Sequence, residues 1–157
     1  MIQLSQKETM LLKDMKSHEE WCIKKYNQSS EQAQDPALKQ MFTNLAQVEQ
    51  QHLNTINQIL NGQAPMMNQT QQSSNPTLSN NKNVTSNMTS ATSQSDLDLC
   101  YDLLNAEKYV SSAYNTTIFE CQDRNVRSAL NHIQKEEQEH GEAIFNYLKA
   151  HGGYPVQ

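Results

Sequence analysis

Two short motifs, each a glutamate followed three residues later by a histidine, are the most chemically informative feature of the sequence. They are Glu49-x-x-His52 and Glu137-x-x-His140. Residues three apart in a helix lie on neighbouring turns of one face, so the carboxylate and the imidazole of each motif could reach a shared ligand. Mixed oxygen and nitrogen donors suit iron or manganese better than a metal that prefers thiolates.

Apolar residues at helical spacing predict that both motifs face the interior of a helix bundle, and they add one inward glutamate to each. Glu19 lies thirty residues before Glu49, and Glu107 lies thirty residues before Glu137. The predicted inward faces are Leu12, Met15, Glu19, Cys22, Tyr26 and Ala33; Leu38, Phe42, Leu45, Glu49, His52, Ile56 and Ile59; Cys100, Leu103, Glu107, Val110, Tyr114 and Cys121; and Val126, Leu130, Ile133, Glu137, His140, Ile144 and Tyr147. Four carboxylates and two imidazoles should therefore converge at one level of the core.

A glutamate from each of two helices, with a Glu-x-x-His motif from each of the other two, is the ligand set of ferritin-like di-iron and di-manganese bundles. The predicted metal ligands are Glu19, Glu49, His52, Glu107, Glu137 and His140, and Glu49 and Glu137 are best placed to bridge two ions. Buried carboxylates are costly unless they are paired or coordinate a metal. The other interpretation is a motif that arose by chance and was copied by duplication, which gives a metal-free polar core that is protonated or filled with water.

Helix start and stop signals position these faces. Ser5 and Glu8 have the spacing of a capping box, Asp35-Pro36 supplies an N-cap and a first-turn proline, and Gly62 can end the second helix. The second half repeats these signals, with Ser93 or Ser95 as the first N-cap, Asp123 as the cap between the helices and Gly152-Gly153 as the stop. The sequence predicts an all-α protein, a ferritin-like antiparallel four-helix bundle made of two repeated helical hairpins, with the long connection between helices two and three.

The two halves align without a gap at an offset of 88 residues, which supports an internal repeat. Identical residues at this offset include Leu11 and Leu99, Asp14 and Asp102, Glu19 and Glu107, Tyr26 and Tyr114, Asp35 and Asp123, Glu49 and Glu137, Gln50 and Gln138, His52 and His140, Ile56 and Ile144, and Leu60 and Leu148. The predicted caps align with caps, and the predicted ligands align with ligands.

Residues 63–95 separate the two halves. Ser, Thr, Asn and Gln make up 23 of these 33 residues, with one charge at Lys82 and no aromatic residue. Such a segment buries too little apolar surface to offset its ordering entropy, which predicts a disordered linker. We therefore expect a first hairpin over 1–62, the linker over 63–95 and a second hairpin over 96–157, with the two hairpins forming one bundle.

Composition excludes several classes of protein. The chain has 157 residues and a formal net charge of −5, with a pI near 5.5, so it offers no basic surface for nucleic acid. It contains no apolar run long enough for a membrane span and begins without a signal-peptide pattern, which predicts synthesis in the cytoplasm. Three cysteines without a C-x-x-C motif disfavour a disulfide framework, a zinc ribbon and a rubredoxin site.

The other conspicuous residues have mainly structural interpretations. Cys22, Cys100 and Cys121 are expected to be buried thiols, while Tyr26 and Tyr114 either hydrogen-bond the inward glutamates or simply pack beside them. Residues expected to face solvent are His18, His132, His151, Glu20, Glu136 and Glu139.

The second half resembles the Coat F family of spore coat proteins. The residues that carry this resemblance are Asp102-Leu103-Leu104, Glu107-Lys108, Tyr114, Glu120, Arg127, Leu130, Ile133, Glu136, His140, Ile144-Phe145 and Gly153-Tyr154. The first half has Glu20 in place of Lys108 and lacks a Gly-Tyr pair after Leu60. The resemblance implies a ferritin-like helical protein of the spore coat in a sporulating cell, with other coat proteins or copies of itself as partners and no assigned catalysis.

Two functions from different classes follow. The first is a structural, spore-coat-associated protein that uses the ferritin-like bundle as a scaffold, in which a centre of two iron or manganese ions could be held. The second is an enzyme, a di-iron or di-manganese carboxylate protein that acts on oxygen or peroxide. The absence of a four-cysteine rubredoxin site from the sequence favours disproportionation of peroxide over a reductase cycle in this second case.

Overall fold

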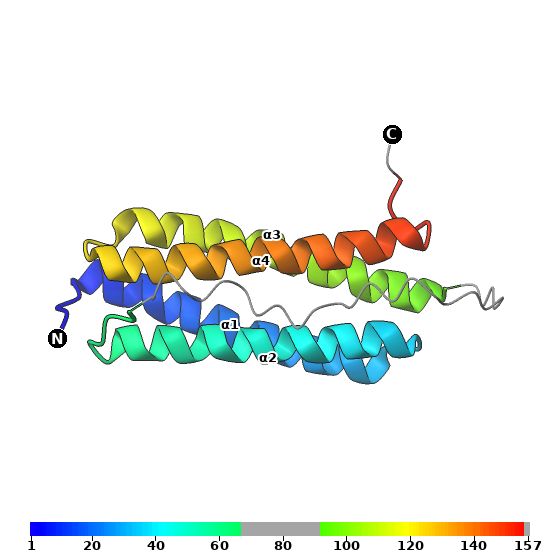
Figure 1. The fold of residues 1–157 in the computed structure, drawn as a ribbon, viewed down its shortest axis with the longest axis horizontal. Coiled ribbons are helices and arrows are strands. Elements are labelled where there is room, and N and C mark those ends of the chain that lie inside the picture. The colour runs from blue at the N-terminus through cyan, green and yellow to red at the C-terminus, as the bar shows by residue number, and fades with distance from the viewer. Residues whose placement is uncertain (67–91, 156–157) are drawn as a thin grey trace.

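The computed structural model describes residues 1–66 and 92–155 as four long helices (Figure 1). Helix α1 spans Gln6–Gln32, α2 Pro36–Leu60, α3 Gln94–Glu120 and α4 Arg124–Ala150. The described residues contain no strand, and the predicted all-α, ferritin-like antiparallel bundle is confirmed. Most of the predicted linker, residues 67–91, lies outside the described part of the chain.

The helix ends follow the predicted signals. Ser5 and Glu8 form a complete capping box at the start of α1, and Asp35 caps α2 directly before Pro36. Ser93 rather than Ser95 caps α3, and Asp123 caps α4. After α2 and α4 the chain turns through Gly62 and Gly152, whose φ angles of 78° and 70° lie in the left-handed region that glycine adopts without strain.

Each hairpin is antiparallel, and the two hairpins lie side by side with α1 next to α3 and α2 next to α4. Figure 1 shows that α2 ends and α3 begins at opposite ends of the bundle. The expected long connection between these helices is therefore required by the topology. No helix within residues 1–66 and 92–155 is long and apolar enough to cross a membrane.

Two buried carboxylates tie the hairpins together, one at each end of the bundle. Glu8 of α1 accepts a hydrogen bond from the backbone N–H of Gln122, 2.8 Å away in the turn between α3 and α4. Asp96 of α3 accepts from the N–H groups of Gln34 and Asp35, at 2.8 and 2.9 Å, in the turn between α1 and α2. Glu8 and Asp96 occupy equivalent positions at the 88-residue offset, so the repeat places the same device at both ends.

The core consists of two apolar clusters with a polar layer between them. One cluster includes Leu12, Met15, Ile56, Ile59, Val126, Leu130 and Ile133; the other includes Leu38, Phe42, Leu103, Leu104, Ile144 and Leu148. The predicted inward faces are buried except at two positions. Ala46 and Leu148 are buried, whereas their neighbours Leu45 and Tyr147 are only half-buried. The polar layer is thereby enclosed along the bundle axis by apolar side chains.

Candidate metal centre

All six predicted ligands lie in the polar layer of the core. Glu19, Glu49 and Glu137 are at most 1% exposed, Glu107 and His52 are 2% exposed, and His140 is 4% exposed. Each comes from the middle of its helix, where the backbone is rigid: Glu19 from α1, Glu49 and His52 from α2, Glu107 from α3, and Glu137 and His140 from α4. The structure thus brings together every residue that the sequence singled out.

The six side chains form two overlapping groups. One group is Glu19, Glu49, His52 and Glu137; the other is Glu49, Glu107, Glu137 and His140. In each group one donor atom per residue lies within 4.8 Å of all the others. Donors around a cation at about 2.1 Å are separated by roughly 3 to 4 Å, so this spacing is close to that of a metal shell. Glu49 and Glu137 belong to both groups, as expected of carboxylates that bridge two ions.

The Nδ1 atoms of both histidines face the carboxylates. His52 Nδ1 lies 3.0 Å from Glu49 Oε2 and 2.8 Å from Glu137 Oε1. His140 Nδ1 lies 2.9 Å from Glu49 Oε1 and 3.5 Å from Glu107 Oε1. The two imidazole rings stack with their centroids 5.7 Å apart. His52 therefore offers its Nδ1 to the first group, and His140 offers its Nδ1 to the second.

Two tyrosines cross between the hairpins to fix the outer glutamates. The hydroxyl of Tyr26 on α1 donates a hydrogen bond to Glu107 on α3, and the hydroxyl of Tyr114 on α3 donates to Glu19 on α1. Burial, together with the nearby carboxylates, raises the pKa of both phenols well above 10, so they remain protonated donors. Of the two roles left open by the sequence, hydrogen bonding to the glutamates is the one observed.

Glu136 is the residue at the site that sequence reasoning placed wrongly. We expected it to face solvent, but it is half-buried and its Oε2 lies 2.7 Å from His52 Nε2. His132, also expected to be solvated, lies 3.3 Å from the other oxygen of Glu136. The sequence did single out Glu136 in another way, because it is one of the residues that carry the resemblance to the Coat F family. The equivalent position in the first half is Val48, so this support for the histidine exists on one side only.

Protons supply the charge balance in the metal-free core. Desolvation lowers the pKa of both histidines, but hydrogen bonds to carboxylates outweigh it, raising the pKa of His140 to about 9 and that of His52 well above 6.5. Burial raises the pKa of Glu19 to about 7, and burial with the charges of Glu49 and Glu107 raises that of Glu137 well above 4.5. For Glu49, desolvation is outweighed by both histidines, which hold its pKa well below 4.5.

Four carboxylate oxygens of the centre are buried without a well-aligned hydrogen-bond donor, although Glu137 Oε1 lies 2.8 Å from His52 Nδ1. They are Glu19 Oε2, Glu107 Oε2 and both oxygens of Glu137. Unpaired buried carboxylate oxygens are costly, and a cation would satisfy them. No thiolate belongs to either group of donors, and burial raises the pKa of Cys22, the nearest buried thiol in sequence to Glu19. This oxygen-rich donor set fits iron or manganese.

The arrangement of the helices agrees with one solved structure, a two-domain protein from Anabaena variabilis that contains DJ-1/ThiJ/PfpI-like and ferritin-like domains. The two chains are 13% identical with a TM-score of 0.69, and the match covers 96% of this chain and 38% of the Anabaena protein. This likeness concerns the fold alone. None of the curated proteins matches the sequence.

The second hairpin matches a family model. The match is to the Coat F domain and covers residues 95–157, which include Glu107, Glu137 and His140. The same residues contain Glu136, Phe145 and the Gly153-Tyr154 pair, which carried the resemblance in the sequence. Residues 95–157 are therefore similar to the Coat F domain, and in this chain they form one half of a ferritin-like four-helix bundle.

Proposed function

We propose that this chain is a spore-coat-associated protein whose bundle binds two divalent ions, iron or manganese, in the polar layer of its core. The Coat F domain supports the association with the coat. The metal proposal rests on the four buried carboxylate oxygens that lack an aligned hydrogen-bond donor within two overlapping Glu and His groups, because a purely structural scaffold gains nothing from burying them in this way.

In this proposal each ion is held by one outer glutamate and one histidine, with Glu49 and Glu137 shared between the ions. Bound to the native state only, the ions stabilise the bundle by mass action, by about 2.7 kcal/mol at a free concentration one hundred times the dissociation constant. Tyr26 and Tyr114 orient the outer glutamates, and Glu136 orients His52 through its Nε2–H. The centre thus joins the two hairpins at mid-length.

The test compares metal content and thermal stability of histidine variants. Protein purified without chelators is analysed for iron and manganese, then compared with His52→Ala and His140→Ala. Both variants should lose metal and unfold at lower temperature, and added metal should no longer raise their melting temperature. His132 is unsuitable as a control because it contacts Glu136. The matched control is His151→Ala, an exposed residue at the end of α4.

The metal proposal is wrong if the protein purifies without metal, takes up neither ion, and both histidine variants match the control in thermal stability. The polar core would then have only a structural role. The coat association is tested separately, by probing coat extracts of purified spores with an antibody against the protein. Its absence from the coat fraction and presence in the cell cytosol would overturn that part of the proposal.

An enzyme acting on oxygen or peroxide is the second candidate, favoured by one observation. Glu107 and Glu137, which are 2% and 1% exposed, line a surface groove, so solvent comes up to the side chains that enclose the centre. Bound metal would supply the redox chemistry, while the carboxylates and tyrosines would hold its geometry. Oxygen release from hydrogen peroxide by metal-loaded protein, lost in His140→Ala, would support this candidate, and no release above free metal would exclude disproportionation.

A further inference from the structure

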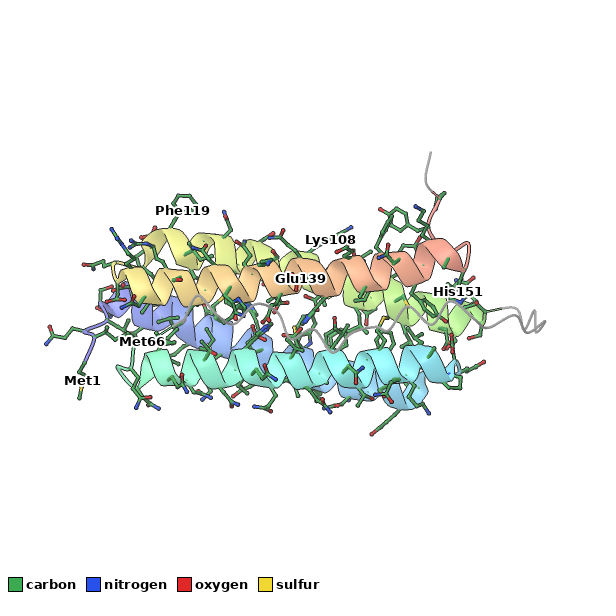
Figure 2. The ribbon with its side chains drawn as sticks, viewed as in Figure 1. Met1, Met66, Lys108, Phe119, Glu139 and His151 are labelled. Carbon is green, nitrogen blue, oxygen red and sulfur yellow. The ribbon has the colours of Figure 1, made fainter. Side chains whose placement is uncertain are left out.

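The groove beside the candidate metal centre lies between α3 and α4 and has a volume of about 780 Å³. Glu107 and Glu137 line its floor, with Glu107 Oε2 and both oxygens of Glu137 buried beneath the surface. Lys108 lies at its exposed rim and points away from the bundle (Figure 2). A water molecule occupies about 30 Å³, so the groove is far larger than dioxygen or peroxide needs. It falls within the range typical of sites for small organic molecules.

Gly141 keeps the groove open. It lies within α4, where glycine destabilises a helix relative to alanine. A Cβ atom at this position would meet only Leu104 Cδ1, at 3.7 Å, so packing does not require glycine. At the 88-residue offset the first hairpin has Leu53, a half-buried side chain. The second hairpin therefore gives up helix stability at a position where the first carries an apolar side chain.

The two ends of the groove differ in chemistry. Because α3 and α4 are antiparallel, Leu104, Phe145 and Tyr154 gather at one end. There Tyr154 stacks on Tyr101 and meets Phe145 edge to face, with ring centroids 6.0 and 5.1 Å apart. The other end carries uncharged hydrogen-bonding groups from Ser111, Ser112, Asn115 and Gln134.

Charge further restricts the ligand. Lys108 and Glu142 are exposed at the rim and contribute one positive and one negative charge, while the carboxylate oxygens of Glu137 are buried beneath the floor. The accessible lining therefore carries no net charge, so neither an anion nor a cation finds an unbalanced opposite charge there. An uncharged ring that carries hydroxyl groups matches both ends of this lining.

We propose that the groove between α3 and α4 binds a small uncharged aromatic alcohol, of which a phenol is the simplest, above the side chains of Glu107 and Glu137. The ring packs beside Phe145 and Tyr154, and the hydroxyl lies toward the uncharged polar end at Ser111. This inference rests on the proposed function only in placing the ligand next to a metal centre. The groove itself is formed by this chain's own residues.

The test is a titration of the full-length protein with 4-methylphenol, followed by amide NMR shifts, on protein as purified and again after treatment with a chelator. The shifts should map to residues around Gly141, Ser111 and Ser112. Gly141→Leu, which fills the groove, should weaken binding at least tenfold. The matched control is Asn54→Leu, an exposed position on α2 at the equivalent of Glu142, which should bind as the wild type does. The anion 4-methylbenzoate should bind at least tenfold more weakly than the phenol.

Gly141→Ala guards against a variant that fails to fold. It should raise the melting temperature and at the same time weaken 4-methylphenol binding. A glycine with only a structural role would not give both effects. Shifts that map elsewhere, or equal binding by Gly141→Leu and the control, would overturn the proposal. Concentration-dependent self-association that Gly141→Leu abolishes would assign the groove to a second copy instead.

The two proposals fail independently. Wild-type protein without bound metal that still binds 4-methylphenol would overturn the metal centre and leave the groove assignment standing. If wild type and Gly141→Leu both contain metal but neither binds 4-methylphenol, the groove assignment is overturned and the metal centre stands.

Discussion

Removing one tyrosine hydroxyl at a time tests whether the polar layer is built to hold metal. Tyr26→Phe removes the hydrogen bond to Glu107, and Tyr114→Phe removes the one to Glu19, while each ring still fills its place between the apolar clusters. Because the ring volume is nearly unchanged, any effect reports the hydroxyl rather than a cavity. The internal repeat makes the two substitutions equivalent, so they should have similar effects.

The expected magnitude follows from the contacts. Loss of a hydrogen bond that orients a metal ligand typically weakens metal binding by about 10- to 100-fold, or about 1.4 to 2.8 kcal/mol. In metal-free protein each substitution leaves one more buried carboxyl oxygen without its donor, which costs about 1 to 3 kcal/mol of folding free energy. Because both tyrosines act on one centre, the double variant should deviate from additivity.

Two assays separate these effects. Competition with a chelating dye under anaerobic conditions gives the affinity for Fe²⁺ or Mn²⁺, and urea unfolding of metal-free protein gives the stability. Tyr147→Phe is the matched control, because the Tyr147 hydroxyl donates to Asp35 at 2.8 Å, far along α4 from the centre. It should lower stability and leave metal affinity unchanged. Metal affinities within twofold of wild type in both Tyr26→Phe and Tyr114→Phe would refute the orienting role.

Two further predictions concern the carboxylates of Glu136 and Glu8. Glu136→Ala removes the partner of His52 Nε2 and should weaken metal binding about tenfold or more. The control is Glu139→Ala, which should leave metal binding unchanged because the Glu139 carboxylate lies outside the centre, 3.7 Å from Lys135. Equal metal affinities in the two variants would contradict a role for Glu136. For Glu8, burial is outweighed by hydrogen bonds from Gln122 and Ser5, which hold its pKa below 4.5, so its ionised form stabilises the fold above that pH and the benefit disappears as pH falls through the lowered pKa. Glu8→Gln should therefore be less stable than wild type at pH 7 by urea unfolding, and this difference in stability should shrink below pH 4.5. A stability difference that does not change with pH would show that the charge of Glu8 is not the cause. The control is Glu31→Gln, at an exposed site.

Most of the fold and the six candidate ligands follow from local sequence signals. Caps and helical periodicity depend on neighbouring residues, so Ser5, Asp35 and Asp123 could be assigned their roles before any tertiary contact was known. The inward positions drifted by one residue in two places, because 3.6 residues per turn do not repeat evenly. Ala46 is buried instead of Leu45 in the middle of α2, and Leu148 instead of Tyr147 near the end of α4.

Contacts between helices were harder to predict. Glu136 lies on the edge of the inward face of α4, and only the approach of His52 from α2 makes it part of the site. The groove likewise depends on the spacing of α3 and α4, which periodicity within one helix does not encode. Gly141 gave a hint, as a glycine within a strong helical pattern, but its meaning needed the neighbouring helix.

The paired carboxylate ties at the two ends of the bundle govern how the protein can open. Because Glu8 holds the turn of the second hairpin and Asp96 holds the turn of the first, neither hairpin can fray without breaking a buried contact with the other. Local unfolding of one half is thereby discouraged, and slow amide hydrogens in both halves should exchange through one shared opening. An ion bound at mid-length would then leave only when the whole bundle opens.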